Sequence, residues 1–158
     1  DWLTWTIDEL GAPERAFLAD LPGTLDLEIG GLKITAYHGS PQSYWDPVLP
    51  DTPDETLEAW FAGTDAHLLL GGHTHRQMLR RWKGRVIINP GTISLTFERL
   101  PFGDWNTRPW AEFAVLTVED GEIDLSFRYV SVDLAELEHR ARASGMPHVE
   151  AWLDGWRG

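Results

Sequence analysis

The sequence contains no cysteine, and this absence limits the chemistry that the chain can perform. It excludes disulfide bonds, thiolate catalysis and zinc sites built from cysteine. Any metal ion must therefore be held by nitrogen and oxygen ligands.

Basic residues are scarce. Thirteen lysines and arginines stand against 25 aspartates and glutamates, which gives a formal net charge of -12. A polyanion such as duplex DNA would meet long-range repulsion, so a nucleic-acid scaffold is excluded as a partner. A bound metal cluster could reverse the field locally, and a small phosphorylated substrate is therefore still compatible with this charge.

Long hydrophobic runs are also absent. No stretch approaches the roughly 20 apolar residues of a membrane span, and the first residues carry no basic segment of the kind that begins a signal peptide. We expect a soluble, cytoplasmic protein without membrane contact. With 158 residues, of which 42% are hydrophobic, the chain is expected to form one domain.

The order of the predicted elements indicates an α/β or α+β layered fold with a substantial sheet. Two strands around Gly30-Gly31 form a hairpin, and a short buried strand at 67–70 is typical of parallel sheets. The predicted helices are 6–10, 12–21, 54–61, 133–144 and 148–156, and the predicted strands are 24–28, 32–37, 67–70, 78–82, 85–88, 112–118 and 123–130.

Three histidines are the candidate metal ligands: His38, His73 and His75. Each follows a predicted strand at a glycine-containing turn, at the edge where α/β sheets place their ligands. A single histidine at a strand end is more often a hydrogen-bonded structural residue, and we assign that role to the others, His67, His139 and His148. For the three together, metal ligation is favoured, and three imidazoles could hold one catalytic zinc with an open position for water.

The sequence offers no obvious carboxylate partner for these histidines. Asp46, Asp51 and Asp65 are loop candidates, but each is expected to be a solvated turn residue. The turn that begins at Asn89 could cap backbone groups or orient the histidine loop, and we expect a structural role for it.

Nine tryptophans are present, and several fall in predicted loops, among them Trp45, Trp105 and Trp110. A loop aromatic such as Trp45, or the segment 102–105, could stack on a base or an aromatic leaving group, or could instead close a dimer contact. The sequence leaves these alternatives open. Trp152 and Trp156 have helical spacing and are expected to pack together.

The chain resembles the calcineurin-like metallophosphoesterase superfamily, and more narrowly its small bacterial and archaeal phosphodiesterases. The resemblance rests on Tyr37-His38-Gly39-Ser40, on Leu70-Gly71-Gly72-His73-Thr74-His75 and on the segment 86–94. It implies part of a four-layer αββα sandwich with mixed sheets, which in the complete enzyme holds two divalent metal ions (Mn, Fe, Zn or Ni). By this resemblance His38 and His73 would bind the second metal and His75 the first, while a metal-bridging hydroxide attacks phosphorus in line.

The chain departs from the family pattern before Tyr37. The early family motifs, Asp-X-His, Gly-Asp and Gly-Asn-His-Asp, do not occur between Asp1 and Tyr37. In the family these motifs supply the bridging aspartate, an asparagine ligand and the histidine that protonates the leaving group. We therefore expect residues 1–158 to form the C-terminal portion of a single metallophosphoesterase domain, and to be weak or inactive alone.

The function predicted from the sequence is metal-dependent hydrolysis of phosphodiesters or small phosphomonoesters by the complete protein. The alternative is a noncatalytic metal-binding or protein-interaction module on the same scaffold. Catalytic and substrate-binding residues cannot be assigned from the sequence. If strands are missing from its sheets, the chain should expose apolar surface and associate with itself or with the missing N-terminal part.

Overall fold

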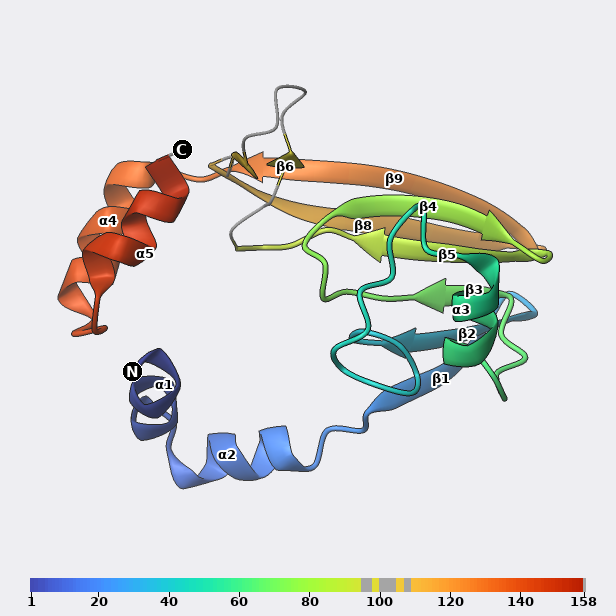
Figure 1. Cartoon of the computed structure of the whole chain (residues 1–158), viewed down its shortest axis with the longest axis horizontal. Coiled ribbons are helices and arrows are strands. Elements are labelled where there is room, and N and C mark those ends of the chain that lie inside the picture. The colour runs from blue at the N-terminus through green and yellow to red at the C-terminus, as the bar shows by residue number, and fades with distance from the viewer. Residues whose placement is uncertain (95–97, 100–104, 107–108, 158) are drawn as a thin grey trace.

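A mixed five-stranded sheet forms the centre of the fold (Figure 1). The computed structural model describes residues 1–94, 98–99, 105–106 and 109–157. The sheet has the order β1-β2-β3-β5-β4, in which β2, β3 and β5 are parallel and the edge strands β1 and β4 are antiparallel to their neighbours. Its strands are β1 (Thr24–Ile29), β2 (Leu32–Tyr37), β3 (Leu68–Leu70), β4 (Gln77–Trp82) and β5 (Arg85–Pro90).

The remaining elements of the described residues are four short or hairpin strands and five helices. The strands are β6 (Glu98–Arg99), β7 (Trp105–Asn106), β8 (Trp110–Glu119) and β9 (Glu122–Ser131). The helices are α1 (Trp2–Glu9), α2 (Ala12–Ala19), α3 (Asp54–Trp60), α4 (Leu134–Ala143) and α5 (Val149–Arg157).

Helix α3 covers one face of the sheet and creates the main core. Two acidic residues in its first turn, Asp54 and Glu55, suit the positive end of the helix dipole. Leu57, on its buried side, is 0% exposed, and Phe61, which follows the helix, is 2% exposed. They pack with buried side chains of four strands, namely Tyr37, Leu69, Met78, Trp82 and Ile87.

The long hairpin β8–β9 lies against the opposite face. At one end of β8, a Cβ atom on Gly30 would lie 2.7 Å from Cγ1 of Val118. At the other end, the Glu112 carboxylate lies against Gly91, which follows β5. Since Gly30 and Gly91 mark opposite corners of the sheet, β8 crosses this face diagonally. Three apolar side chains on the crossed face are almost fully buried: Ile34, Leu68 and Ile88.

The terminal helices approach one another at the far end of the molecule (Figure 1). The indole Nε1 of Trp2 donates a hydrogen bond of 2.5 Å to the carbonyl oxygen of Pro147. Arg142 joins α4 to α5 through its ion pair with Glu150, and it also pairs with Glu138 of its own helix. Helices α1 and α2 contribute no buried residue to the core.

The predicted elements are confirmed to within a few residues at each end, and so is the mixed α/β class. The Gly30-Gly31 turn has positive φ at both glycines, 56° and 78°, as a tight hairpin turn requires. The short strands β6 and β7 were not expected, and Trp105 lies in β7. Trp110 was assigned to a loop, which is wrong because it begins β8. The rest of the 102–105 segment lies outside the described residues.

Among the described helices, none has the length and apolar character needed to cross a membrane.

Candidate metal centre

The three candidate histidines lie at one edge of the sheet. His38 directly follows β2, and the loop with His73 and His75 follows β3. Because β2 and β3 are parallel neighbours, their carboxyl ends meet at the same edge. The loops are joined directly, since Gly72 N donates a hydrogen bond of 2.8 Å to the carbonyl oxygen of His38.

The imidazoles of His38 and His73 face each other. Their ring centroids lie 5.2 Å apart, and the ring planes meet at 68°. A Cβ atom on Gly72 would make an ordinary van der Waals contact with Nδ1 of His38, at 3.6 Å. Two imidazoles from separate strands thus share one small region.

The loop that carries His73 and His75 has an unusual backbone conformation. His73 and His75 both have positive φ, 68° and 54°, a conformation that is uncommon for residues other than glycine. Asn89, at the end of β5 and 2% exposed, holds this loop. Its Nδ2 donates to the carbonyl oxygen of Gly72 at 2.8 Å and to Oγ1 of Thr74 at 2.9 Å.

The environment favours the neutral form of His38. Burial lowers the pKa of His38 below its usual 6.5, and the neighbouring imidazoles of His73 and His75 lower this pKa further when they carry charge. A neutral imidazole has a free ring nitrogen and is the form that binds metal ions.

Carboxylates do not complete a metal site within the part of the chain that the structure describes. No group of three or more His, Asp or Glu residues there lies in an arrangement that could hold a metal ion. Asp46 accepts a hydrogen bond of 2.5 Å from Oγ of Ser40, and Asp65 forms an ion pair with Lys33. Asp46 therefore bonds within its own loop, and Asp65 belongs to a surface ion pair.

Glu112 is a residue at this edge that sequence reasoning missed. Its carboxylate lies against Gly91 and accepts a hydrogen bond of 3.3 Å from Nε1 of Trp110. Carboxylate ligands were expected in loops after strands, whereas Glu112 lies inside β8, 37 residues after His75.

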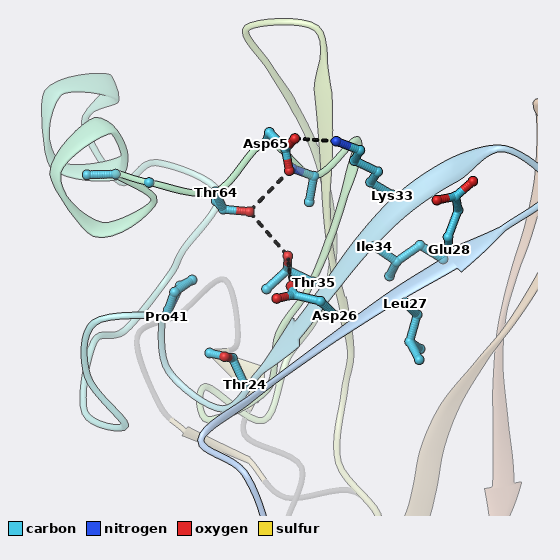
Figure 2. A pocket seen from close by; sticks show the side chains of 13 residues that line it. Thr24, Asp26, Leu27, Glu28, Lys33, Ile34, Thr35, Pro41, Thr64 and Asp65 are labelled. Carbon is cyan, nitrogen blue, oxygen red and sulfur yellow. Dashed lines mark hydrogen bonds and ion pairs between the residues drawn. The ribbon is translucent and has the colours of Figure 1, made fainter.

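Figure 2 shows a large pocket that is lined mainly by residues of β1, of β2 and of the segment 62–66. It has a volume of about 550 Å³ and lies beside the edge formed by β1 and β2. Lys33 in its lining is ion-paired with Asp65, and Thr35 donates to Asp26 at 2.6 Å. These polar groups satisfy one another, and the pocket contains none of the three candidate ligands.

A sequence model of the calcineurin-like phosphoesterase superfamily domain matches residues 7–121, which is more than half of the chain. The chain belongs to the calcineurin-like phosphoesterase superfamily. The resemblance drawn from the motifs around His38, His73 and Asn89 is therefore confirmed. Members of this superfamily generally use divalent metal ions.

Solved structures agree with this assignment. A hypothetical protein from Pyrococcus horikoshii OT3 is 26% identical, with a TM-score of 0.72, over 94% of this chain and 56% of its own length. A metallophosphoesterase from Sphaerobacter thermophilus has the same fold, with 22% identity and a TM-score of 0.73, over 96% of this chain and 64% of its own length. The chain thus spans less than two thirds of either relative. Among curated proteins, none matches.

Proposed function

We propose that this chain carries the histidine part of a metal-dependent phosphoesterase site, which hydrolyses phosphodiesters or small phosphomonoesters in the complete protein. The observation that supports this proposal most directly is the meeting of His38 and His73, whose rings lie 5.2 Å apart after two parallel strands. In a member of the phosphoesterase superfamily, that juxtaposition is best explained as a ligand pair.

The donor set suits a divalent metal ion. As the family resemblance implies, His38 and His73 would hold one such ion and His75 a second, since neutral imidazole binds manganese, iron, zinc and nickel. When bound, the metal supplies positive charge for a phosphoryl oxygen and activates a water molecule for attack on phosphorus. The protein's own contribution is orientation: Asn89 fixes the loop of His73 and His75, and the bond from Gly72 to His38 joins the two ligand loops.

The three histidines need further donors. We propose that residues 1–158 act as the C-terminal portion of one metallophosphoesterase domain, and that bridging carboxylates and the general acid come from a further segment or a companion chain. Two observations support this proposal. The early family motifs are absent before Tyr37, and the described residues contain no three-donor metal group.

A noncatalytic metal-binding or interaction module is the second candidate function. The exposed apolar side chains of α1 and α2, such as Leu3 at 70% and Phe17 at 65%, favour it. Such a module would bind at most one metal ion through its histidines and would need no upstream motif. Metal-dependent turnover therefore separates the two candidates.

The deciding experiment measures metal content and manganese-dependent hydrolysis of bis(p-nitrophenyl) phosphate. It compares this chain with the gene product extended upstream, each with and without His75→Ala. Asn89→Asp tests positioning, because it keeps every imidazole but removes the amide donor to Gly72 and Thr74. His139→Ala is the matched control, since His139 is an exposed histidine of α4.

We expect activity only in the extended protein. His75→Ala should abolish it, Asn89→Asp should weaken metal binding about tenfold because the ligand loop loses its anchor, and His139→Ala should leave both unchanged. Metal binding without hydrolysis in every form would support the module. Absence of both metal and hydrolysis in the extended protein would overturn the phosphoesterase proposal.

A further inference from the structure

Trp45 lies beside the candidate metal centre and is 79% exposed. Its ring centroid is 6.1 Å from that of His73, and the two ring planes meet at 85°. The indole therefore stands edge-to-face with an imidazole that itself faces His38. Most of its large aromatic surface is left to the solvent next to the site.

The loop that carries Trp45 is held in place by its own hydrogen bonds. Oγ of Ser40 accepts hydrogen bonds from the backbone N–H groups of Gln42, at 3.0 Å, and Ser43, at 3.2 Å, and donates one to Asp46. The backbone N of Trp45 donates to Oγ of Ser43 at 3.1 Å. The indole is thus exposed on a loop whose conformation is fixed by hydrogen bonds.

Gly39 allows this loop to turn closely. A Cβ atom at that position would lie 2.6 Å from the carbonyl oxygen of Ser43 and 2.7 Å from backbone atoms of Tyr44. Local contacts within this loop thus fix the segment that connects His38 to Trp45, and the indole lies against the imidazole of His73.

We propose that Trp45 is a substrate-binding residue that stacks on a planar aromatic group of a small phosphoester, while the phosphate lies at the histidines. This inference rests on the proposed function and adds a substrate class to it. An exposed indole offers a π face on which any planar ring can stack. The net charge of -12 disfavours a long polynucleotide, so the ring belongs to a small molecule.

Two kinds of small phosphoester carry such a ring, namely a nucleotide and an aryl phosphate. The ring of an aryl phosphate is attached directly to the ester oxygen, whereas a nucleobase is separated from the phosphate by a sugar. The test therefore uses AMP, phenyl phosphate and ribose 5-phosphate, which has the sugar and phosphate but no aromatic ring.

Binding of these three compounds is measured by NMR on the full 158-residue chain loaded with Zn²⁺, so that the readout is independent of turnover. Trp45→Phe assigns the indole N–H signal of Trp45 by its disappearance. We expect AMP or phenyl phosphate to shift this signal and to bind about tenfold more tightly than ribose 5-phosphate. The aromatic compound that binds more tightly identifies the kind of ring.

Variants separate stacking from a structural role. Trp45→Ala should reduce the affinity for the aromatic compounds to that for ribose 5-phosphate, and Trp45→Phe should restore most of the difference. Phe17→Ala removes an aromatic side chain that is 65% exposed on α2, and it should change nothing.

Three results would overturn the inference. If all three compounds shift the histidine signals equally and leave Trp45 unmoved, the phosphate site exists but the aromatic contact does not. If the Trp45 signal moves with protein concentration and not with ligand, the indole closes a contact between copies. If none of the compounds binds to this chain or to the protein extended upstream, each loaded with Zn²⁺, both this inference and the phosphate site of the proposed function fail.

Discussion

At the scale of single residues, the candidate site depends on keeping imidazoles neutral. Burial is the main cause of the lowered pKa of His38, and the neighbours His73 and His75 lower it further. A proton on any one of the three rings would repel a metal ion and the other two rings. The lowered pKa of His38 thus reduces the competition of protons with a metal ion for this ring below pH 6.5.

This arrangement predicts the titration of His38. In the metal-free chain, NMR should give a pKa for His38 below 6.5, because burial penalises the charged ring. The unfolded chain then binds more protons than the folded chain between the folded pKa and 6.5. The contribution of His38 to the free energy of unfolding is therefore fully present above pH 6.5. It is lost as the pH falls through the pKa of His38 in the folded chain.

Two variants test the causes of the lowered pKa of His38. His73→Ala should raise the pKa of His38 only part of the way to 6.5, because burial remains, and His139→Ala should leave it unchanged. A pKa at or above 6.5 in the parent chain would contradict the geometry described here.

The sequence predicted the three histidines, but it offered Asn89 only as one alternative for orienting their loop, and a structural role was preferred. His38, His73 and His75 each follow a strand beside a glycine, which is a local pattern. By contrast, Asn89 reaches Gly72 and Thr74 across 17 and 15 positions, and no local pattern reveals such a bond. The contact between Trp45 and His73 likewise depends on how two loops fold against each other.

At the scale of elements, the loops after β2 and β3 fit together because glycine occupies position 71. A Cβ atom there would lie 2.5 Å from Cε2 of Tyr37 and 2.9 Å from its Cζ. The Tyr37 ring cannot move away easily, because it is 9% exposed and packs against Phe61 with centroids 5.4 Å apart. Its buried position also raises the pKa of Tyr37.

Gly71→Ala should therefore destabilise the fold by about 1–3 kcal/mol, the usual cost of overpacking a rigid core. Gly72→Ala is the matched control, since its Cβ would lie at an ordinary 3.6 Å from Nδ1 of His38. Urea unfolding of the two variants measures the difference. Equal stabilities of the two variants would show that the Tyr37 ring can move to make room for the added methyl group.

The elements and the mixed α/β class were well predicted, but the order of the strands was not. The glycine pair of the β1–β2 hairpin and the apolar run of β3 are signals contained within a few residues. The order of the sheet and the diagonal path of β8 depend on contacts between distant segments. The hydrophobic periodicities of strands (two residues) and helices (3.6 residues) carry no information about those contacts.

At the scale of the whole molecule, part of the apolar surface is left uncovered. Leu25, Leu27 and Ile29 share the face of Ile34 that β8 crosses, yet they are 48%, 40% and 46% exposed. They lie on β1, which is an edge strand of the sheet among the described residues. Such an edge is a template for association with another strand.

We therefore expect the isolated chain to self-associate with rising concentration in sedimentation velocity experiments. Leu27→Lys should shift the distribution toward the monomer, because a charge on an edge strand opposes pairing. Ala143→Lys adds the same charge at an exposed position of α4 and should have no effect. A monodisperse parent chain that unfolds cooperatively as a monomer would contradict the expectation.

The left-handed backbone of His73 and His75 has a consequence for how this sequence can evolve. Each costs about 1–2 kcal/mol relative to glycine, which adopts positive φ freely. Selection for thermal stability alone would therefore favour glycine at both positions, and the two histidine ligands would be lost. Directed evolution of this scaffold for heat tolerance would need a parallel screen for metal retention to keep them.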